Sequence, residues 1–247
     1  MSEARERITT TVQIGVSTCL LGERVRHDGG HKRDPFVVET LARRFRLVPV
    51  CPEVEIGLGT PREPIRLLRQ GGDTRLVGVD SGRDHTDRMK AFARRRVSEL
   101  AALDIDGYVL KSASPSCGMR EVAIHLRGGR VRRTGRGLFA ATLIERLPLL
   151  PVEDEGRLRD AAIRESFIER VLAYRRVKTL FAGRWITADL VRFHEREQMR
   201  LLAHDARAAR ALDRLVACAH ERPRRESARR YMTGFMKALA KPPTRRP

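Results

Sequence analysis

Short apolar runs and longer stretches of helical spacing alternate along the first half of the chain. Four runs are typical of buried strands and cover residues 14–18, 47–50, 75–79 and 107–110. Apolar side chains at helical spacing predict helices over residues 35–45, 84–103 and 138–147, the first of them capped by Asp34. Strands that alternate with helices form parallel sheets with right-handed crossovers. We therefore expect an α/β fold with an N-terminal Rossmann-like parallel sheet.

The pattern changes at about residue 156, after which strand-like runs give way to long helical patterns. These predict helices over residues 158–179, 187–200, 207–220 and 225–239. Thr187 and Asp205 are the expected N-caps, and the glycine-punctuated basic stretch 127–136 is expected to be a loop. We accordingly divide the chain into an α/β domain, residues 1–152, and an all-helical domain, residues 153–247.

Three of the four cysteines directly follow predicted strands: Cys19, Cys51 and Cys117. Ligands bind beyond the carboxyl ends of parallel strands, so these thiols are expected to meet in one crevice although they lie far apart in the sequence. The alternative is that they are ordinary buried cysteines at strand ends. Cys218 falls on the apolar face of a predicted helix and is expected in the core.

Polar residues near these cysteines are candidates for proton transfer and substrate binding. Glu53 follows Cys51 by two residues and is either a proton carrier or a surface carboxylate. Ser114 precedes a proline and is either a substrate contact or a turn residue. Asp28 either binds substrate or fixes its own loop. Arg62 would meet a phosphate or a carboxylate.

Composition limits the class of protein. The 247 residues are 41% hydrophobic, which is enough for a sizeable core. The sequence contains no apolar run near the roughly 18 residues of a membrane span and no apolar signal region after Met1. The four cysteines do not form a compact disulfide framework. We expect a cytoplasmic protein with free or metal-bound thiols.

The net charge of +19 is unevenly spread, with +9 over residues 1–150 and +10 over residues 151–247. This excess favours a polyanionic partner, although arginine-rich composition alone would also produce it. Four arginines at helical spacing would suit phosphate groups, or are simply a solvated helix face: Arg192, Arg196, Arg200 and Arg207.

Zinc is one interpretation of the cysteines. Three thiolates with His27 or His31 would suit tetrahedral Zn²⁺, and a nearby glutamate is also found in zinc nucleobase deaminases. The paired Pro-Cys-x-x-Cys motif of those enzymes is absent from this sequence.

Three motifs, in order, carry a resemblance to a known family. They are CLLG with RHDG at residues 19–22 and 26–29, VCPE with TPR at 50–53 and 60–62, and KSASPSCG at 111–118. With them the chain resembles the thiouracil desulfurase (DUF523) family, and its C-terminal part is similar to the DUF1722 domain often fused to it. The combination is similar to bacterial desulfidases that remove sulfur from 4-thiouridine in tRNA.

The resemblance implies a [4Fe-4S] cluster held by three cysteines, with one iron left open for the substrate's sulfur, which is released as hydrosulfide. The implied ligands are Cys19, Cys51 and Cys117, the implied catalytic residues are Glu53 and Ser114, and Asp28 and Arg62 are candidate substrate contacts. The helical domain would hold tRNA while the base reaches the cluster. The alternatives are a desulfurase of free thiouracil-type bases and a non-catalytic, metal-containing nucleic-acid-binding protein.

The sequence departs from the family pattern in two places. Relatives continue with a further helix beyond the segment that matches residues 242–245, whereas this sequence ends at Pro247. We therefore expect the second domain to be incomplete at its C-terminus. His27 stands where many relatives have a tyrosine before the Asp-Gly pair.

Overall fold

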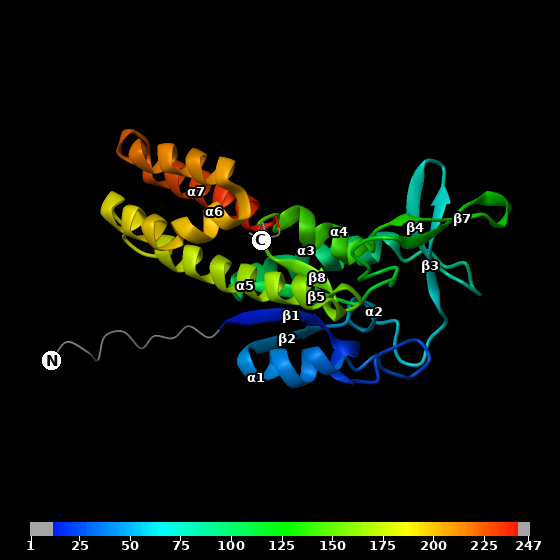
Figure 1. Cartoon of the computed structure of the whole chain (residues 1–247). Coiled ribbons are helices and arrows are strands. Elements are labelled where there is room, and N and C mark those ends of the chain that lie inside the picture. Colours follow the sequence, from blue (N-terminus) through cyan, green and yellow to red (C-terminus); the bar gives the residue numbers. More distant parts are fainter. Residues whose placement is uncertain (1–11, 242–247) are drawn as a thin grey trace. The chain divides into compact units, whose positions relative to one another are not determined.

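A computed structural model describes residues 12–241 of the chain (Figure 1). The chain forms two compact units, Met1–Arg164 and Glu165–Pro247. The division falls inside helix α5 (Ala161–Phe181), beyond the boundary expected at residue 152, because residues 152–154 form a strand of the first unit's sheet. Residues 244–247, on which the expectation of an incomplete second domain rests, lie outside the described part.

The first unit is built on a parallel sheet, as the sequence predicts. Its strands are β1 (Gln13–Ser17), β2 (Arg46–Val50), β5 (Gly107–Leu110) and β8 (Val152–Asp154), in the order β2-β1-β5-β8. The chain leaves β1 toward β2 on one side and later adds β5 on the other side. The direction of winding therefore reverses at β1, and ligands bind at such a switch point.

Helices cover both faces of this sheet. In Figure 1, α1 (Ala42–Arg44), which continues η2 (Phe36–Leu41), lies on one side, and α3 (Thr86–Ala102) and α4 (Leu138–Arg146) lie on the other. Right-handed crossovers in opposite directions along the sheet require this arrangement. Asp34 accepts a hydrogen bond from the Val37 N–H (3.0 Å), which confirms it as the cap. The core between the sheet and the helices that cover it includes Tyr108 and Phe139, whose ring centroids are 5.9 Å apart.

A second, mixed sheet was not expected. Two hairpins, β3 (Ile65–Gln70) with β4 (Asp73–Gly78) and β6 (Val122–His125) with β7 (Val131–Gly135), join through a parallel β3–β6 pair. The predicted strand 75–79 is antiparallel β4, so its placement in the parallel sheet is wrong. The predicted loop 127–136 is η3 (Arg127–Gly129) followed by β7. Gly71 and Gly72, with φ of 57° and 88°, form the tight turn that closes the first hairpin.

Three short helices each follow a strand of the parallel sheet. η1 (Thr18–Leu21) follows β1, α2 (Pro52–Glu55) follows β2, and η4 (Arg157–Arg159) follows β8. Each therefore begins near a carboxyl end of the parallel sheet, and η1 and α2 carry or adjoin the first two cysteines of the predicted site.

The second unit is helical, as expected. It contains most of α5, then α6 (Thr187–Ala217), η5 (Ala219–Glu221) and α7 (Arg224–Leu239). The two helices predicted over 187–220 are one element with a non-helical residue at Asp205, whose side chain accepts hydrogen bonds from the next turn at Arg207 (3.1 Å) and Ala208 (3.0 Å). The prediction of a cap at Asp205 is confirmed.

Thr187 is not the cap that begins α6. Ile186 precedes the helix, and its N–H is satisfied by Asp189 in the first turn (2.9 Å). Cys218, expected in the core, is only half-buried. Among residues 12–241, no helix is long and apolar enough to cross a membrane.

Candidate active site

Three cysteine side chains line one cavity of about 300 Å³ beyond the carboxyl ends of β1, β2 and β5. They are Cys19, Cys51 and Cys117, the three that the sequence places after strands. Glu53, Arg62 and Ser114 line the same cavity. The parallel sheet thus brings together residues that lie up to almost 100 positions apart in the sequence.

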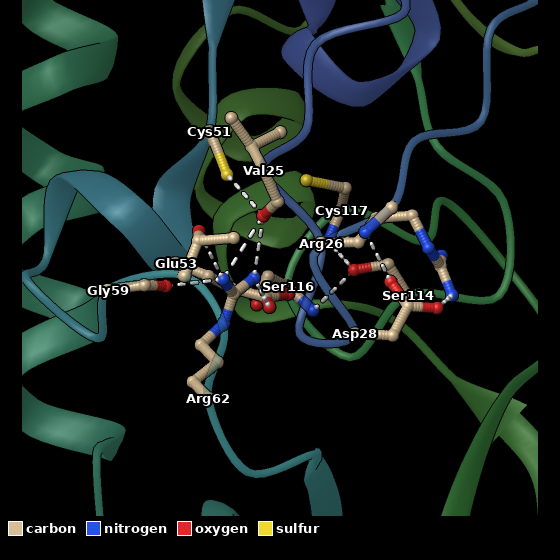
Figure 2. A network of polar contacts seen from close by, with 12 residues as sticks. Val25, Arg26, Asp28, Cys51, Glu53, Gly59, Arg62, Ser114, Ser116 and Cys117 are labelled. Carbon is tan, nitrogen blue, oxygen red and sulfur yellow. Dashed lines mark hydrogen bonds and ion pairs between the residues drawn. The ribbon is translucent and has the colours of Figure 1, made fainter.

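Each cysteine is held by its local backbone. The Cys19 carbonyl, in η1, accepts a hydrogen bond from the Lys32 N–H (2.9 Å). Cys51 is the N-cap of α2, and its N–H donates to the Glu55 carboxylate (2.9 Å). Its Sγ lies 3.9 Å from the Val25 carbonyl oxygen (Figure 2). Cys19 and Cys51 are therefore held on short helical segments that begin where β1 and β2 end.

Cys117 sits on a turn that is fastened to the start of α4. The Ser114 hydroxyl accepts hydrogen bonds from the Ser116 and Cys117 N–H groups (3.1 Å each). The free N–H groups of the α4 N-terminus satisfy carbonyls of the same turn, including Phe139 N–H to Ser116 (3.0 Å). The sequence showed both the turn and the helix but gave no sign that they bind each other.

The thiols of the cavity are all shifted toward the protonated form. Burial, with a contribution from the neighbouring Cys51, raises the pKa of Cys19 to about 11. Burial likewise raises the pKa of Cys51, and it raises that of Cys117 well above the usual range. A metal that binds these thiols must displace their protons. Its bonds to sulfur must then offset the desolvation cost of placing negatively charged thiolates in a buried site.

Three cysteine thiols at one cavity are a donor set that suits an iron–sulfur cluster, since thiolates are the usual ligands of such clusters. All four cysteines are free thiols. Among residues 12–241, no group of three His, Cys, Asp or Glu side chains is close enough to hold a single ion. A cluster is wider than one ion, and its cysteines bind different iron atoms, so they need not converge on one point. His31, a ligand in the zinc interpretation, instead accepts a hydrogen bond from the Arg33 N–H (3.2 Å).

Glu53 is held against Arg62 at the cavity wall. The Arg62 guanidinium donates to the Glu53 carboxylate at 2.6 Å and to the carbonyls of Val25 (3.1 Å) and Gly59 (2.7 Å), as Figure 2 shows. Only 6% of the Arg62 side chain and 16% of the Glu53 side chain are exposed. Of the two partners considered for Arg62, the structure provides a carboxylate. Its donors are largely used within the protein, which suits it to hold Glu53 in one orientation.

The Ser114 hydroxyl still has its proton to donate after it has accepted two hydrogen bonds. A serine oxygen has two lone pairs, and both are engaged by the two N–H groups of its turn. The hydroxyl proton is left to donate, and the residue lines the cavity. Ser114 therefore shapes the turn and also offers a donor to whatever enters.

Asp28 is not among the residues that line the cavity within the described chain. Its carboxylate accepts from the Gly30 N–H (2.9 Å) and from Arg26 (3.3 Å), and these two bonds lower its pKa to about 2. It therefore fixes the loop that carries Arg26 and His27, which do line the cavity. The structure supports the loop-fixing interpretation of Asp28.

Two groups at the cavity were not assigned from the sequence. Lys111 lies in the third motif, and its ammonium binds the Glu155 carboxylate (2.5 Å). Burial raises the pKa of Glu155, but hydrogen bonds from Lys111 and Ser112 outweigh this and lower it. Ser17, the last residue of β1, also lines the cavity. Nothing in their local sequence indicates these contacts, because each partner comes from a different strand end.

The close fit between the Cys117 turn and α4 leads to a prediction. A Cβ atom on Gly137 would lie 2.4 Å from the Ser116 carbonyl and 2.8 Å from the Cys117 nitrogen. We expect Gly137→Ala to destabilise the protein by about 2 kcal/mol, because the backbone must shift to relieve this overlap, and to lower iron uptake. Thermal unfolding and iron analysis test this. Gly183→Ala is the matched control, since its Cβ would meet nothing within 4 Å, and equal behaviour of the two variants would contradict the prediction.

The architecture and cavity define a class: an α/β protein with a three-thiol site at the carboxyl edge of a parallel sheet. Residues 14–155 match the family model described as 2-thiouracil desulfurase. The chain belongs to this 2-thiouracil desulfurase family, as the motifs indicated. Residues 198–247 match the model described as a protein of unknown function, DUF1722.

Two similar proteins have been found. The uncharacterized protein YbbK of Bacillus subtilis (strain 168) is 31% identical over 135 residues, which cover 53% of this chain and 88% of YbbK. Among solved structures, the [4Fe-4S]-dependent thiouracil desulfidase TudS is 35% identical with a TM-score of 0.50, and the match covers 63% of this chain and 98% of that one. The family and this neighbour agree with the prediction of an iron–sulfur desulfidase of thiolated uracil.

Proposed function

We propose that this protein is a [4Fe-4S]-dependent desulfidase of thiolated uracil bases, with Cys19, Cys51 and Cys117 as the cluster ligands. The observation that carries the proposal is the common cavity of these three thiols, with Glu53 and Ser114 in its wall. The similarity to TudS, a [4Fe-4S]-dependent thiouracil desulfidase, supports the cofactor and the reaction class. The matching segment includes all three cysteines, since the family model spans residues 14–155.

The reaction replaces sulfur by oxygen without net electron transfer. Water adds its oxygen to the thiocarbonyl carbon, and the sulfur leaves as hydrosulfide with one proton released. When bound, the cluster would supply an iron without a protein ligand to accept the sulfur. Glu53 takes the proton from the attacking water and returns it to the ring nitrogen or the leaving sulfur. Arg62 keeps that carboxylate directed into the cavity, and Ser114 donates a hydrogen bond to the base.

We further propose that the substrate is 4-thiouridine in tRNA. The support is the net charge of +10 over residues 151–247, which suits contact with RNA phosphates. Arg196 and Arg207 are exposed on α6, whereas Arg192 pairs with Asp189 and Arg200 with Glu169 (2.8 Å). A stacked base must be flipped out to reach the cavity, at a cost of about a few kcal/mol, and a second unit that grips the RNA would offset this cost.

The test is an anaerobic assay of the full chain after reconstitution with iron and sulfide. Bulk bacterial tRNA is added, and 4-thiouridine and uridine are quantified after digestion to nucleosides. We expect conversion that requires iron and that falls at least about tenfold between 50 and 200 mM salt, because RNA binding by cationic side chains releases counterions. Conversion of free 4-thiouracil should depend little on salt.

The same assay separates the alternatives. Turnover of the free base without turnover of tRNA would make the protein a desulfurase of free thiouracil-type bases. No turnover of either substrate, in protein shown to hold its iron, would favour the non-catalytic nucleic-acid-binding protein. A preparation of the wild-type chain that takes up no iron under these conditions would overturn the cluster itself.

A further inference from the structure

A second cavity lies beside the cysteine cavity in the first unit. Its volume is about 340 Å³, and Ser112 and Ala113 line both cavities. Three exposed arginines from different segments also line it: Arg120 just before β6, Arg133 in β7 and Arg157 in η4. We call this cavity the arginine groove. The turn at Ser112 and Ala113 therefore separates the cavity of the three thiols from a cluster of guanidinium groups.

Two of these guanidinium groups share one buried carboxylate. Glu153 is 6% exposed and accepts hydrogen bonds from Arg157 (2.9 Å) and Arg120 (3.5 Å). A guanidinium has five N–H donors, and both side chains remain 41% exposed. Glu153 therefore holds the two arginines at the groove while most of their donors stay available to a ligand.

Arg133 supplies the third guanidinium, which makes no hydrogen bond or ion pair with any residue of the described chain. It stands opposite Ala123 of β6, on the edge strand of the second sheet. A charged residue on an edge strand also prevents pairing with other sheets. That role alone does not require Arg120 and Arg157 to line the same groove.

The surroundings of the groove are strongly basic. Its acidic side chains are Glu121, which is exposed, and Asp154, which is 5% exposed and accepts a hydrogen bond from the Arg157 backbone N–H (3.0 Å). Residues 120–136 nevertheless contain six arginines against one glutamate, a net charge of +5. Such a surface attracts a polyanion, and the planar fork of arginine matches the oxygens of a phosphate group.

The β6–β7 hairpin is fastened to the turn that carries Cys117. The Gly137 N–H donates to the Gly118 carbonyl (2.8 Å), and the Arg136 guanidinium donates to the Met119 carbonyl (3.0 Å). These bonds join the two ends of the hairpin segment directly after the third cysteine. A nucleic acid bound at the groove would therefore be held beside the cysteine cavity.

We propose that the arginine groove binds a backbone phosphate of the nucleic acid that carries the thiolated base. The inference rests on the tRNA substrate of the proposed function, and it adds a phosphate contact in the first unit to the basic helices of the second. The shared turn at Ser112 and Ala113 lets one nucleotide reach both cavities, with its base among the thiols and its phosphate at the arginines. A free base has no phosphate and gains nothing from the groove.

The experiment measures the binding of end-labelled bulk bacterial tRNA to the full chain, reconstituted without oxygen, by fluorescence anisotropy at several salt concentrations. We expect Arg133→Gln to weaken binding about tenfold, because it removes a charged hydrogen-bond donor. The slope of log affinity against log salt should fall by about 1. Arg133→Lys keeps the charge but not the fork, so its affinity should lie between those of Arg133→Gln and the wild type. Thermal unfolding shows that the variants are folded.

Arg43→Gln is the matched control, because Arg43 is an exposed arginine of α1 that lines neither cavity. Equal tRNA affinities of Arg133→Gln and Arg43→Gln would overturn the proposal, since net charge alone would then account for the effect. A wild-type chain that binds no tRNA would overturn it as well. Specific weakening by Arg133→Gln without conversion of 4-thiouridine would support the groove and contradict the proposed reaction. Conversion in tRNA with the same KM for wild type and Arg133→Gln would contradict the groove and leave the reaction standing.

Discussion

Replacing Glu53 by glutamine is expected to lower sulfur release by about 100-fold to 10,000-fold, the range over which general acid–base groups contribute. The amide keeps the size of the carboxylate and can still accept a hydrogen bond from Arg62, but it cannot take a proton from water. Cluster content should stay at the wild-type level, because Glu53 binds no thiol in the described chain. Single-turnover assays of iron-loaded protein measure the effect directly.

The substitution also removes the charge partner of a buried guanidinium. Arg62 is 6% exposed in its side chain and would keep its two carbonyl contacts. A loss of stability of about 1–3 kcal/mol is therefore expected, and thermal unfolding must accompany the assay. Glu39→Gln is the matched control, since Glu39 is an exposed carboxylate paired with Arg33. Activity of iron-loaded Glu53→Gln near that of Glu39→Gln would rule out Glu53 as the proton carrier.

In the proposed mechanism the two residues of this pair have different roles: Arg62 positions the carboxylate, and Glu53 transfers the proton. The guanidinium reaches Glu53 and two backbone carbonyls at once, a fork that lysine cannot reproduce. The contact with Arg62 explains how the Glu53 carboxylate can stay in one place beside the cavity cysteines without binding them. The sequence supplies both residues, but only the loop that runs from α2 back to the cavity brings them within 2.6 Å.

The parallel sheet and its cysteines could be predicted because their signals are local. An apolar run followed at once by a cysteine marks a buried strand and the residue at its end, and the topology of such sheets places those ends together. The motif residues Glu53 and Ser114 lie within three positions of a cysteine, so they enter the cavity with it. Asp28 lies in the same motif region but faces its own loop, which residue type and spacing alone do not distinguish.

The parts that were missed depend on contacts between distant segments. β3 and β6 pair although more than 50 residues separate them, and their hairpins carry arginines that weaken the alternating apolar pattern. The predicted loop 127–136 is half strand for this reason. The bond between Ser17 and Lys111 and the fastening of the Cys117 turn by α4 likewise join separate strand ends. Such contacts define the chemical environment of the thiols, which the motifs leave open.

Each single replacement of Cys19, Cys51 or Cys117 by serine is expected to abolish stable cluster binding. Serine keeps the shape but offers a hard oxygen whose proton is much harder to displace than that of a thiol, and iron–sulfur clusters are held by thiolates. The two remaining thiols, whose pKa values burial raises in every case, would have to retain the cluster alone. Iron and acid-labile sulfide per chain should fall to near background, with sulfur release lost in proportion.

Cys218→Ser provides the control for this set. Cys218 follows α6 in the second unit and is not one of the residues that line the cavity, so its replacement should leave the iron content unchanged. Full iron content in any one of the three cavity variants would show that the missing thiol is not a ligand, and the three-cysteine assignment would then be wrong. Loss of iron in all three variants, with Cys218→Ser unaffected, would show that the segments after β1, β2 and β5 each contribute one ligand. The folding of the parallel sheet would then itself assemble the metal site, because no two of these cysteines are close in the sequence.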